Sequence, residues 1–224
     1  MAGKLVVEGC KLSSASLTCI SVHHKDTKPK IRRCEIYQCA GTGVHFYDGS
    51  EGVVEDTEIH HNGQSGIEIS EGSRPEIRFN RIRSNGKHGV AVFDNGRGVI
   101  TDNDINSNGL SGIDVRESSN PRIVRNKIFG HEHSGGVDVH HHSRCEIEKN
   151  DIFQNSLSGI TCWQAGKPLC KQNRITQNGE FGILVKDGGW GTFEHNDLRG
   201  NSRGSLFVSE DSKNKIVLDN NSVE

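Results

Sequence analysis

A repeat of about 23 residues runs through almost the whole chain and decides what the chain can fold into. One apolar position, usually the third residue of an Asn-x-Ile triplet, recurs at steps of 23 or 24 residues. It is occupied by Leu12, Ile36, Ile59, Ile82, Ile105, Ile128, Ile152, Ile175 and Leu198. Self-similarity at such a period indicates stacked structural units that share one continuous core.

Each repeat carries three short apolar segments separated by polar corners. In the segment that follows a Gly, apolar residues alternate with an outward residue, as in the pairs Val90/Val92 and Ile113/Val115. This alternation is typical of a strand with one buried face. The sequence therefore predicts an all-β fold: a single-stranded right-handed parallel β-helix of about nine 23-residue coils with three strands each. We expect one domain over residues 1–224, with regular coils over about 5–218.

Two columns of Asn mark the corners of the predicted coils. The first contains Asn80, Asn103, Asn126, Asn150, Asn173 and Asn196, and the second contains Asn62, Asn85, Asn108, Asn155, Asn178 and Asn201. Stacked Asn side chains can bond to the coils above and below and satisfy corner backbone groups. We assign both columns to structure.

Composition limits the partners and the compartment. Only 32% of residues are apolar, which suits a thin solenoid core, and a net charge of -2 gives no electrostatic reason to expect nucleic acid or an anionic membrane. The first apolar run soon meets Glu8, so we expect no signal peptide and no membrane span. Seven cysteines, an odd number, favour buried thiols in the cytoplasm or nucleus. Neither end offers an amphipathic helix, which leaves end-to-end self-association open.

Two segments carry a resemblance to a known family. The segments are Gly89–Gly98 and Glu117–Ile128, and prolines recur at alternate coils, at Pro29, Pro75, Pro121 and Pro168. They resemble the β-helix repeats of F-box only protein 11 and its relatives over about residues 29–200. This resemblance implies a module that receives substrate proteins for a Skp1-cullin-F-box ubiquitin ligase. The repeats also resemble the carbohydrate-binding and sugar-hydrolysis domain of β-helix proteins such as pectate lyases and alginate epimerases.

The outward residues of the wall that begins with Gly form the first candidate site. The predicted binding face contains His45, Tyr47, Glu68, Phe93, Asp114, Arg116, Asp138, His140, Trp163 and Lys186. Aromatic residues that point to solvent from a rigid wall suit anchors for an extended peptide or a sugar. We rank recognition of a protein or peptide partner first, without a cofactor. A carbohydrate ligand is the alternative.

Catalysis is the second reading of the same wall. Asp114 and Arg116 fall one coil away from Asp138 and His140. Paired carboxylates with an Arg and a His could bind calcium and abstract a proton from a uronic acid. The competing structural reading is an ordinary polar outer face.

Histidines suggest a third, weaker site. His131 and His133 lie in a corner that contains one extra residue, and His141 could approach them from the same coil. Their spacing matches no standard zinc pattern, and a partly exposed histidine patch explains them equally. A purely architectural rod is the remaining functional alternative.

Overall fold

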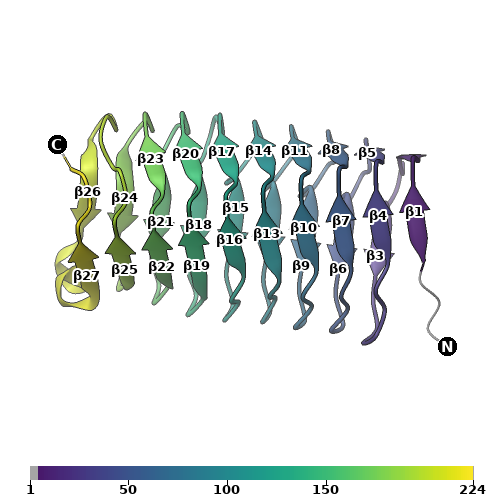
Figure 1. The fold of residues 1–224 in the computed structure, drawn as a ribbon, viewed down its shortest axis with the longest axis horizontal. Helices are drawn as coiled ribbons and strands as arrows, with labels where there is room; N and C mark the ends of the chain where they lie inside the picture. The colour runs from purple at the N-terminus through teal and green to yellow at the C-terminus, as the bar shows by residue number, and fades with distance from the viewer. Residues whose placement is uncertain (1–4, 224) are drawn as a thin grey trace.

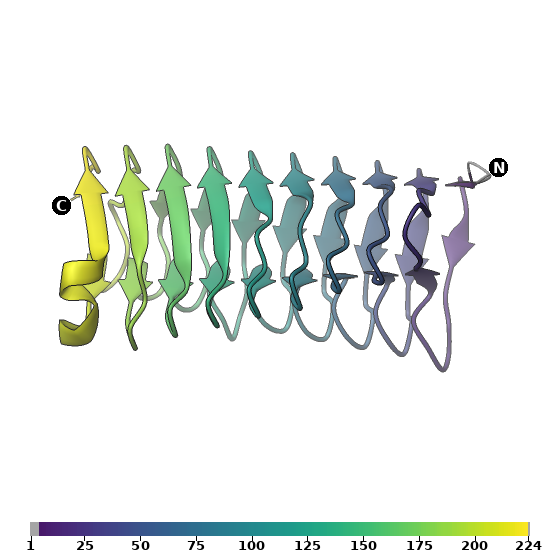
Figure 2. The same ribbon diagram turned by 90° about the horizontal axis from the view of Figure 1, so that it is seen from below.

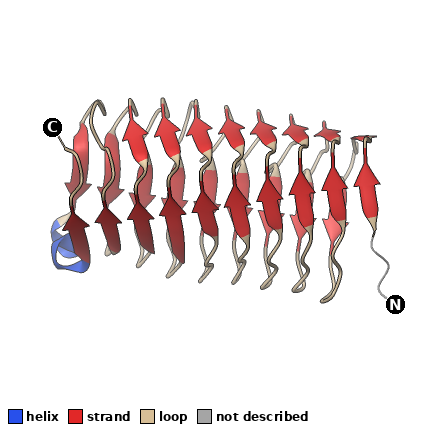
Figure 3. Ribbon diagram, in the orientation of Figure 1, coloured by secondary structure: helices blue, strands red, loops and turns tan. Residues whose placement is uncertain are grey.

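The computed structural model describes residues 5–223, which form a rod of stacked coils whose three walls are parallel sheets (Figure 1). Successive coils lie side by side along the rod, and every paired strand is parallel to its neighbour in the adjacent coil. The fold is the right-handed β-solenoid that the repeat predicts. The irregular segments between strands are short (Figure 3).

Sheet A contains ten strands among the described residues. They are β1 (Val6–Glu8), β4 (Lys30–Arg32), β7 (Val53–Glu55), β10 (Glu76–Arg78), β13 (Val99–Thr101), β16 (Arg122–Val124), β19 (Arg144–Glu148), β22 (Lys167–Lys171), β25 (Gly191–Glu194) and β27 (Ile216–Asp219).

Sheet B contains eight strands within residues 5–223. They are β2 (Lys11–Leu12), β5 (Glu35–Tyr37), β8 (Glu58–His60), β11 (Arg81–Arg83), β14 (Asp104–Asn106), β17 (Lys127–Phe129), β20 (Asp151–Phe153) and β23 (Arg174–Thr176).

Sheet C is the wall whose strands follow the Gly positions, and it has nine strands in the described part of the chain. They are β3 (Ile20–Val22), β6 (Val44–Phe46), β9 (Ile67–Ile69), β12 (Val90–Val92), β15 (Ile113–Val115), β18 (Val137–Val139), β21 (Ile160–Cys162), β24 (Phe181–Val185) and β26 (Gly204–Val208).

The core is a set of columns of branched side chains that run along the rod axis. Ile82, Ile105 and Ile128 occupy one column of sheet B and are 0% exposed. Each fully buried side chain of this size stabilises the fold by roughly 1.5–3 kcal/mol before entropy is subtracted. Because a single coil buries few such side chains, the coils depend on their neighbours for stability.

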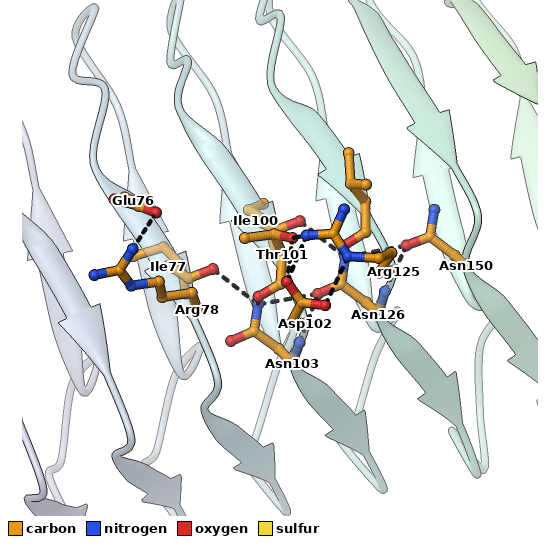
Figure 4. Close-up of polar contacts among 11 residues, drawn as sticks. Glu76, Ile77, Arg78, Ile100, Thr101, Asp102, Asn103, Arg125, Asn126 and Asn150 are labelled. Carbon is orange, nitrogen blue, oxygen red and sulfur yellow. Dashed lines mark hydrogen bonds and ion pairs between the residues drawn. The ribbon is translucent and has the colours of Figure 1, made fainter.

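The Asn columns form continuous hydrogen-bonded ladders, as predicted. Figure 4 shows one rung: the side-chain amide of Asn103 donates to the carbonyl oxygen of Ile77 (2.9 Å) and to Oδ1 of Asn126 (2.9 Å). The backbone N–H of Asn103 donates to the same Oδ1 at 3.0 Å. Asn126 repeats the pattern with Asn150 in the next coil. Each Asn therefore satisfies buried corner groups that the strands leave unpaired.

Two features differ from the sequence-based expectation. Cys19 and Cys39 form a disulfide, although all seven cysteines were expected to be thiols. Their positions in adjacent coils place the Cα atoms 5.8 Å apart, within the range that a disulfide spans. The other difference is a 3-10 helix, η1 (Glu210–Lys215), which lies beside the last coil (Figures 2 and 3). The repeat could not predict it, because the segment falls outside the period.

The described residues include no helix long and apolar enough to cross a bilayer. Apolar side chains are exposed at both ends of the rod, at Val6 in β1 and at Val217 and Leu218 in β27. End-to-end association stays a prediction.

Candidate functional site

The outward side chains of sheet C form rows along the rod, because strands pair in register. Asp114 in β15 lies directly opposite Asp138 in β18, and Ala91 and Thr161 occupy the same row on the outer sides. Neighbouring strands of a sheet are about 4.8 Å apart. The two carboxyl groups predicted to meet are therefore on adjacent coils.

Asp114 is the centre of a buried polar cluster. Asp114 is 4% exposed. Its carboxylate accepts a hydrogen bond from Nε2 of His140 at 2.9 Å and forms an ion pair with the guanidinium of Arg116. Nδ1 of His140 lies 2.5 Å from Nδ1 of His141, so the carboxylate and the two rings form one hydrogen-bonded chain. Such a chain can share a proton between its members.

The environment of Asp114 favours its ionised form. Burial would raise the pKa of this carboxyl, but the hydrogen bond from His140 and the charges of His88, Arg116 and His140 together lower it. The donors that face the Asp114 carboxylate replace the water molecules that burial removes, so its ionised form stays favoured.

Asp138 has the opposite environment. Burial raises the pKa of its carboxyl, and the negative charge of Asp114 raises it further. The hydroxyl group of Ser111 donates to Asp138 and lowers the pKa only in part. The structure thus holds two carboxyl groups on adjacent coils whose pKa values are displaced in opposite directions.

Stacked rings and cations continue this cluster along sheet C. The rings of His140 and Trp163 stack with centroids 4.5 Å apart, and Nζ of Lys186 lies 6.0 Å from the Trp163 ring. On the other side, the guanidinium carbon of Arg116 lies 4.6 Å from the ring centroid of Phe93. These contacts leave Trp163 and Phe93 half-buried on the outer side of sheet C, so less of each ring is available as an anchor than the sequence suggested.

The N-terminal part of the predicted face is separate from the carboxylate pair. His45 stacks with Tyr47 (centroids 4.9 Å apart), and its Nε2 lies 2.9 Å from Oγ of Ser70. Burial lowers the pKa of His45. Glu68 is half-buried in β9, in the row of Asp114 and two coils away from it.

Two members of the cluster escaped the sequence analysis. His88 and Ser111 occupy the position just before the Gly that opens β12 and β15, and this position looks like part of a corner. Burial lowers the pKa of His88, and its buried Nδ1 has no hydrogen-bond partner in the described part of the chain. The residue before each Gly recurs with the period of the repeat, and that recurrence is the signal that points to His88 and Ser111.

Comparisons with known proteins give the family. The family model of the right-handed β-helix region matches residues 2–128 and 75–223. The chain belongs to this right-handed β-helix family. No curated protein sequence matches the chain.

Solved structures share the fold of this β-helix. The periplasmic alginate epimerase AlgG aligns with a TM-score of 0.80 at 17% identity over 95% of this chain and 58% of that protein. The pectate lyase Pel9A gives a TM-score of 0.65 at 18% identity over 87% of this chain and 55% of that protein. The A-module of mannuronan C-5 epimerase AlgE6 from Azotobacter vinelandii gives 0.60 at 16% identity, with coverages of 88% and 64%.

These likenesses establish the fold and nothing finer. The β-helix described here spans less than two thirds of the length of each of these three neighbours. The comparisons give no support to the F-box family, so that resemblance stays a prediction.

The three histidines considered for a metal do not converge in this β-helix. His131 is 0% exposed and takes the place of an Asn in the ladder, with Nδ1 2.7 Å from Oδ1 of Asn155 and Nε2 3.3 Å from Nδ2 of Asn108. His133 and His141 are exposed. The positions of these histidines give the weak metal hypothesis no support: the extra residue of the corner leaves the ladder column intact, and His131 is held there between Asn108 and Asn155.

Calcium also does not fit the carboxylate pair of this β-helix. The Asp114 carboxylate faces the guanidinium of Arg116, which would repel a cation, and Asp138 is engaged by Ser111. Within residues 5–223 no group of three His, Cys, Asp or Glu side chains is arranged to hold a metal ion.

The buried imidazole in the ladder predicts an acid-sensitive rod. Burial lowers the pKa of His131 from 6.5 to about 4, so the unfolded chain binds the proton first and stability falls as pH drops from about 6.5 towards 4. At about 1.4 kcal/mol per pKa unit, the loss is about 3 kcal/mol at pH 4. His131→Asn restores the ladder amide and should remove this loss, measured by denaturant unfolding at pH 7 and pH 4.

The matched control is His133→Asn, which changes an exposed ring in the same corner. It should leave the pH dependence as in the unmodified chain. Equal acid sensitivity in both variants would contradict a buried neutral His131.

Proposed function

We propose that this β-helix binds an acidic polysaccharide along sheet C and moves a proton at carbon 5 of a uronic acid residue. The observation that carries the proposal is the pair of adjacent carboxyl groups, Asp114 and Asp138, with pKa values displaced in opposite directions. Carbon 5 of a uronate is acidic only when its carboxylate is neutralised, and this pair lies beside a cation and a base.

Each residue of the cluster has a role in this proposal. Arg116 and Asp138, the carboxyl group of the pair whose raised pKa favours the protonated form, neutralise the substrate carboxylate. His140 accepts the proton from carbon 5 at Nδ1 when the exposed ring of His141 turns away from it, and Asp114, bonded to Nε2, stabilises the imidazolium that forms. His141 is exposed and in contact with His140, so it passes the proton to water.

Two outcomes can follow the proton abstraction. Return of a proton from water to the opposite face of the ring inverts carbon 5. Alternatively the C4–O4 bond breaks, water protonates the departing oxygen, and the chain is cleaved with a double bond between carbons 4 and 5. Structural neighbours of both kinds support the proposal: an alginate epimerase and a pectate lyase share this fold.

The proposal replaces protein recognition as the first choice. The half-buried state of Trp163 and Phe93 removes the argument from solvent-exposed anchors, and the structural neighbours are polysaccharide-acting proteins. A role as a substrate-receiving module of a ubiquitin ligase is the second candidate, on the sequence resemblance alone.

Hydrogen exchange tests the proposal without choosing between the two outcomes. Polymannuronate, polyguluronate and polygalacturonate are incubated with the protein in deuterated water, and the proton at carbon 5 is followed by NMR. We expect deuterium to enter, or an unsaturated product to form, with one of these polymers. If neither deuterium exchange nor an unsaturated product is found with any of the three polymers, proton transfer is refuted.

A further inference from the structure

An exposed tryptophan outside the carboxylate cluster has two lysine side chains near its ring. Trp190 is 39% exposed and directly precedes β25 at the corner between sheets C and A. Nζ of Lys167, the first residue of β22, lies 5.3 Å from its ring centroid, and Nζ of Lys215, the last residue of η1, lies 5.7 Å from it. Three segments distant in the sequence therefore meet at one ring.

The surface around this ring is hollowed on both sides. One cavity of about 260 Å³ is lined by His142, Arg144, Ala165, Lys167 and Trp190. A second, of about 470 Å³, shares Trp190 with the first and extends to His141 and Lys215. Together they form an open groove along the corner, wide enough for a small ring rather than for a buried ligand.

The cations of this groove form no salt bridge within residues 5–223. In the part of the chain that the structure describes, Arg144, Lys167 and Lys215 have no carboxylate within 4.0 Å. Neighbouring cations on sheet A do have one: Arg122 pairs with Glu146 at 2.8 Å and Lys171 pairs with Glu194 at 2.9 Å.

Two carboxylates also lie near the groove. Asp187 lines the second cavity and lies 3.9 Å from Lys186. Asp211 accepts a hydrogen bond from Ser209, which, together with the charge of Lys215, lowers its pKa. Even with these two charges, the side of the groove formed by Arg144 and Lys167 is positive.

We propose that Trp190, Lys167, Arg144 and Lys215 form a subsite for an anionic sugar. The flat indole face packs against the apolar face of a pyranose ring, and the cations bind the carboxylate that the ring carries. Among anions, a charged sugar fits best because it presents a flat apolar face and a charge together, whereas an acidic peptide would use the cations and leave the indole without a partner.

The subsite is continuous with the carboxylate cluster. His141 lines the second cavity, contacts His140, and lies with its ring centroid 5.8 Å from that of Trp163. A polymer held at Trp190 would therefore pass His141 on its way to Asp114 and Asp138. This inference rests on the proposed function for the identity of the polymer, but binding at Trp190 requires no turnover.

The two tryptophans of the chain allow the subsite to be observed directly. Trp163→Phe leaves Trp190 as the single indole, and its fluorescence is titrated with oligomers of mannuronate and galacturonate of increasing length. We expect saturable quenching in this variant. No change of Trp190 fluorescence with any charged oligomer would overturn the subsite.

Affinity measurements on variants test the chemistry. Trp190→Ala and the double variant Lys167→Ala/Lys215→Ala should each weaken oligomer binding at least about tenfold, whereas Trp190→Phe keeps a flat ring and most of the affinity. The control is Lys171→Ala in the same strand, whose side chain is paired with Glu194 and should leave binding unchanged. Neutral oligosaccharides should not bind, and equal binding of poly-glutamate would assign the groove to acidic peptides instead.

The two measurements distinguish failure of the proposed reaction from failure of the proposed subsite. Binding that depends on Trp190, found together with no exchange at carbon 5, would leave the subsite intact and refute the proposed reaction. Exchange at carbon 5 that is insensitive to Trp190→Ala at every oligomer length would refute the subsite and leave the reaction.

Discussion

Asp138→Asn is expected to slow proton exchange at carbon 5 of a uronate polymer by about 10²- to 10⁴-fold, the range typical of a positioned acid or base. Asn has nearly the same shape and still accepts the hydrogen bond from Ser111. It has no acidic proton to offer, so the substrate carboxylate keeps its charge and carbon 5 stays weakly acidic. The rate constant is measured by NMR at saturating polymer, and oligomer binding should change little.

The pH profile adds a second signature. Burial raises the pKa of Asp138, so its protonated form is lost, and the rate falls, as pH rises through that raised value. The Asp138→Asn variant should lack this fall in rate, which is the high-pH limb of the profile. Asp94→Asn, which changes an exposed carboxylate in the turn after β12, is the matched control and should keep both the rate and the limb.

Stability distinguishes a functional carboxyl group from a structural one. A carboxyl group whose pKa is raised in the folded state destabilises that state as pH rises from about 3.8 through the raised value. Asp138→Asn should therefore raise the melting temperature at neutral pH while it lowers activity. An unchanged rate, or a lower melting temperature with a proportional loss of binding, would contradict the proposed acid role.

The repeat made the fold and the carboxylate pair predictable. A fixed period converts sequence position into spatial neighbours, so the sequence alone places Asp114 and Asp138 on adjacent coils, as the structure shows. The same rule identified the buried column of Ile82, Ile105 and Ile128.

The period of the repeat does not predict side-chain conformations or the paths of the corners. Trp163 is half-buried because its ring stacks on that of His140. This stacking depends on side-chain rotamers, which the register of the strands does not specify. The Cys19–Cys39 disulfide and the meeting of Trp190 with Lys215 depend on corner paths and on η1, which interrupts the repeat. The place of His131 in the Asn ladder follows from its position in the repeat, which its residue type conceals.

Asn126→Ala is expected to lower the free energy of unfolding by about 4 kcal/mol, because a buried donor or acceptor left without a partner costs about 1–3 kcal/mol. Oδ1 of Asn126 accepts from the backbone N–H of Asn103 at 3.0 Å, and its amide donates to the carbonyl oxygen of Ile100 at 2.8 Å. Alanine removes both partners and also leaves the Asn103 side-chain amide without its acceptor at 2.9 Å. Denaturant unfolding followed by circular dichroism measures the change.

The control for this loss is Asn120→Ala, which removes an exposed amide from the same coil and should cost less than about 0.5 kcal/mol. Because each coil contacts only its neighbours, a weakened ladder in the middle of the rod should also separate the unfolding of the two halves. Two transitions would then replace one, and limited proteolysis would cut first near Asn126. A single transition with unchanged midpoint would mean that strand pairing alone holds the coils together, and that the Asn ladder follows from the fold without stabilising it.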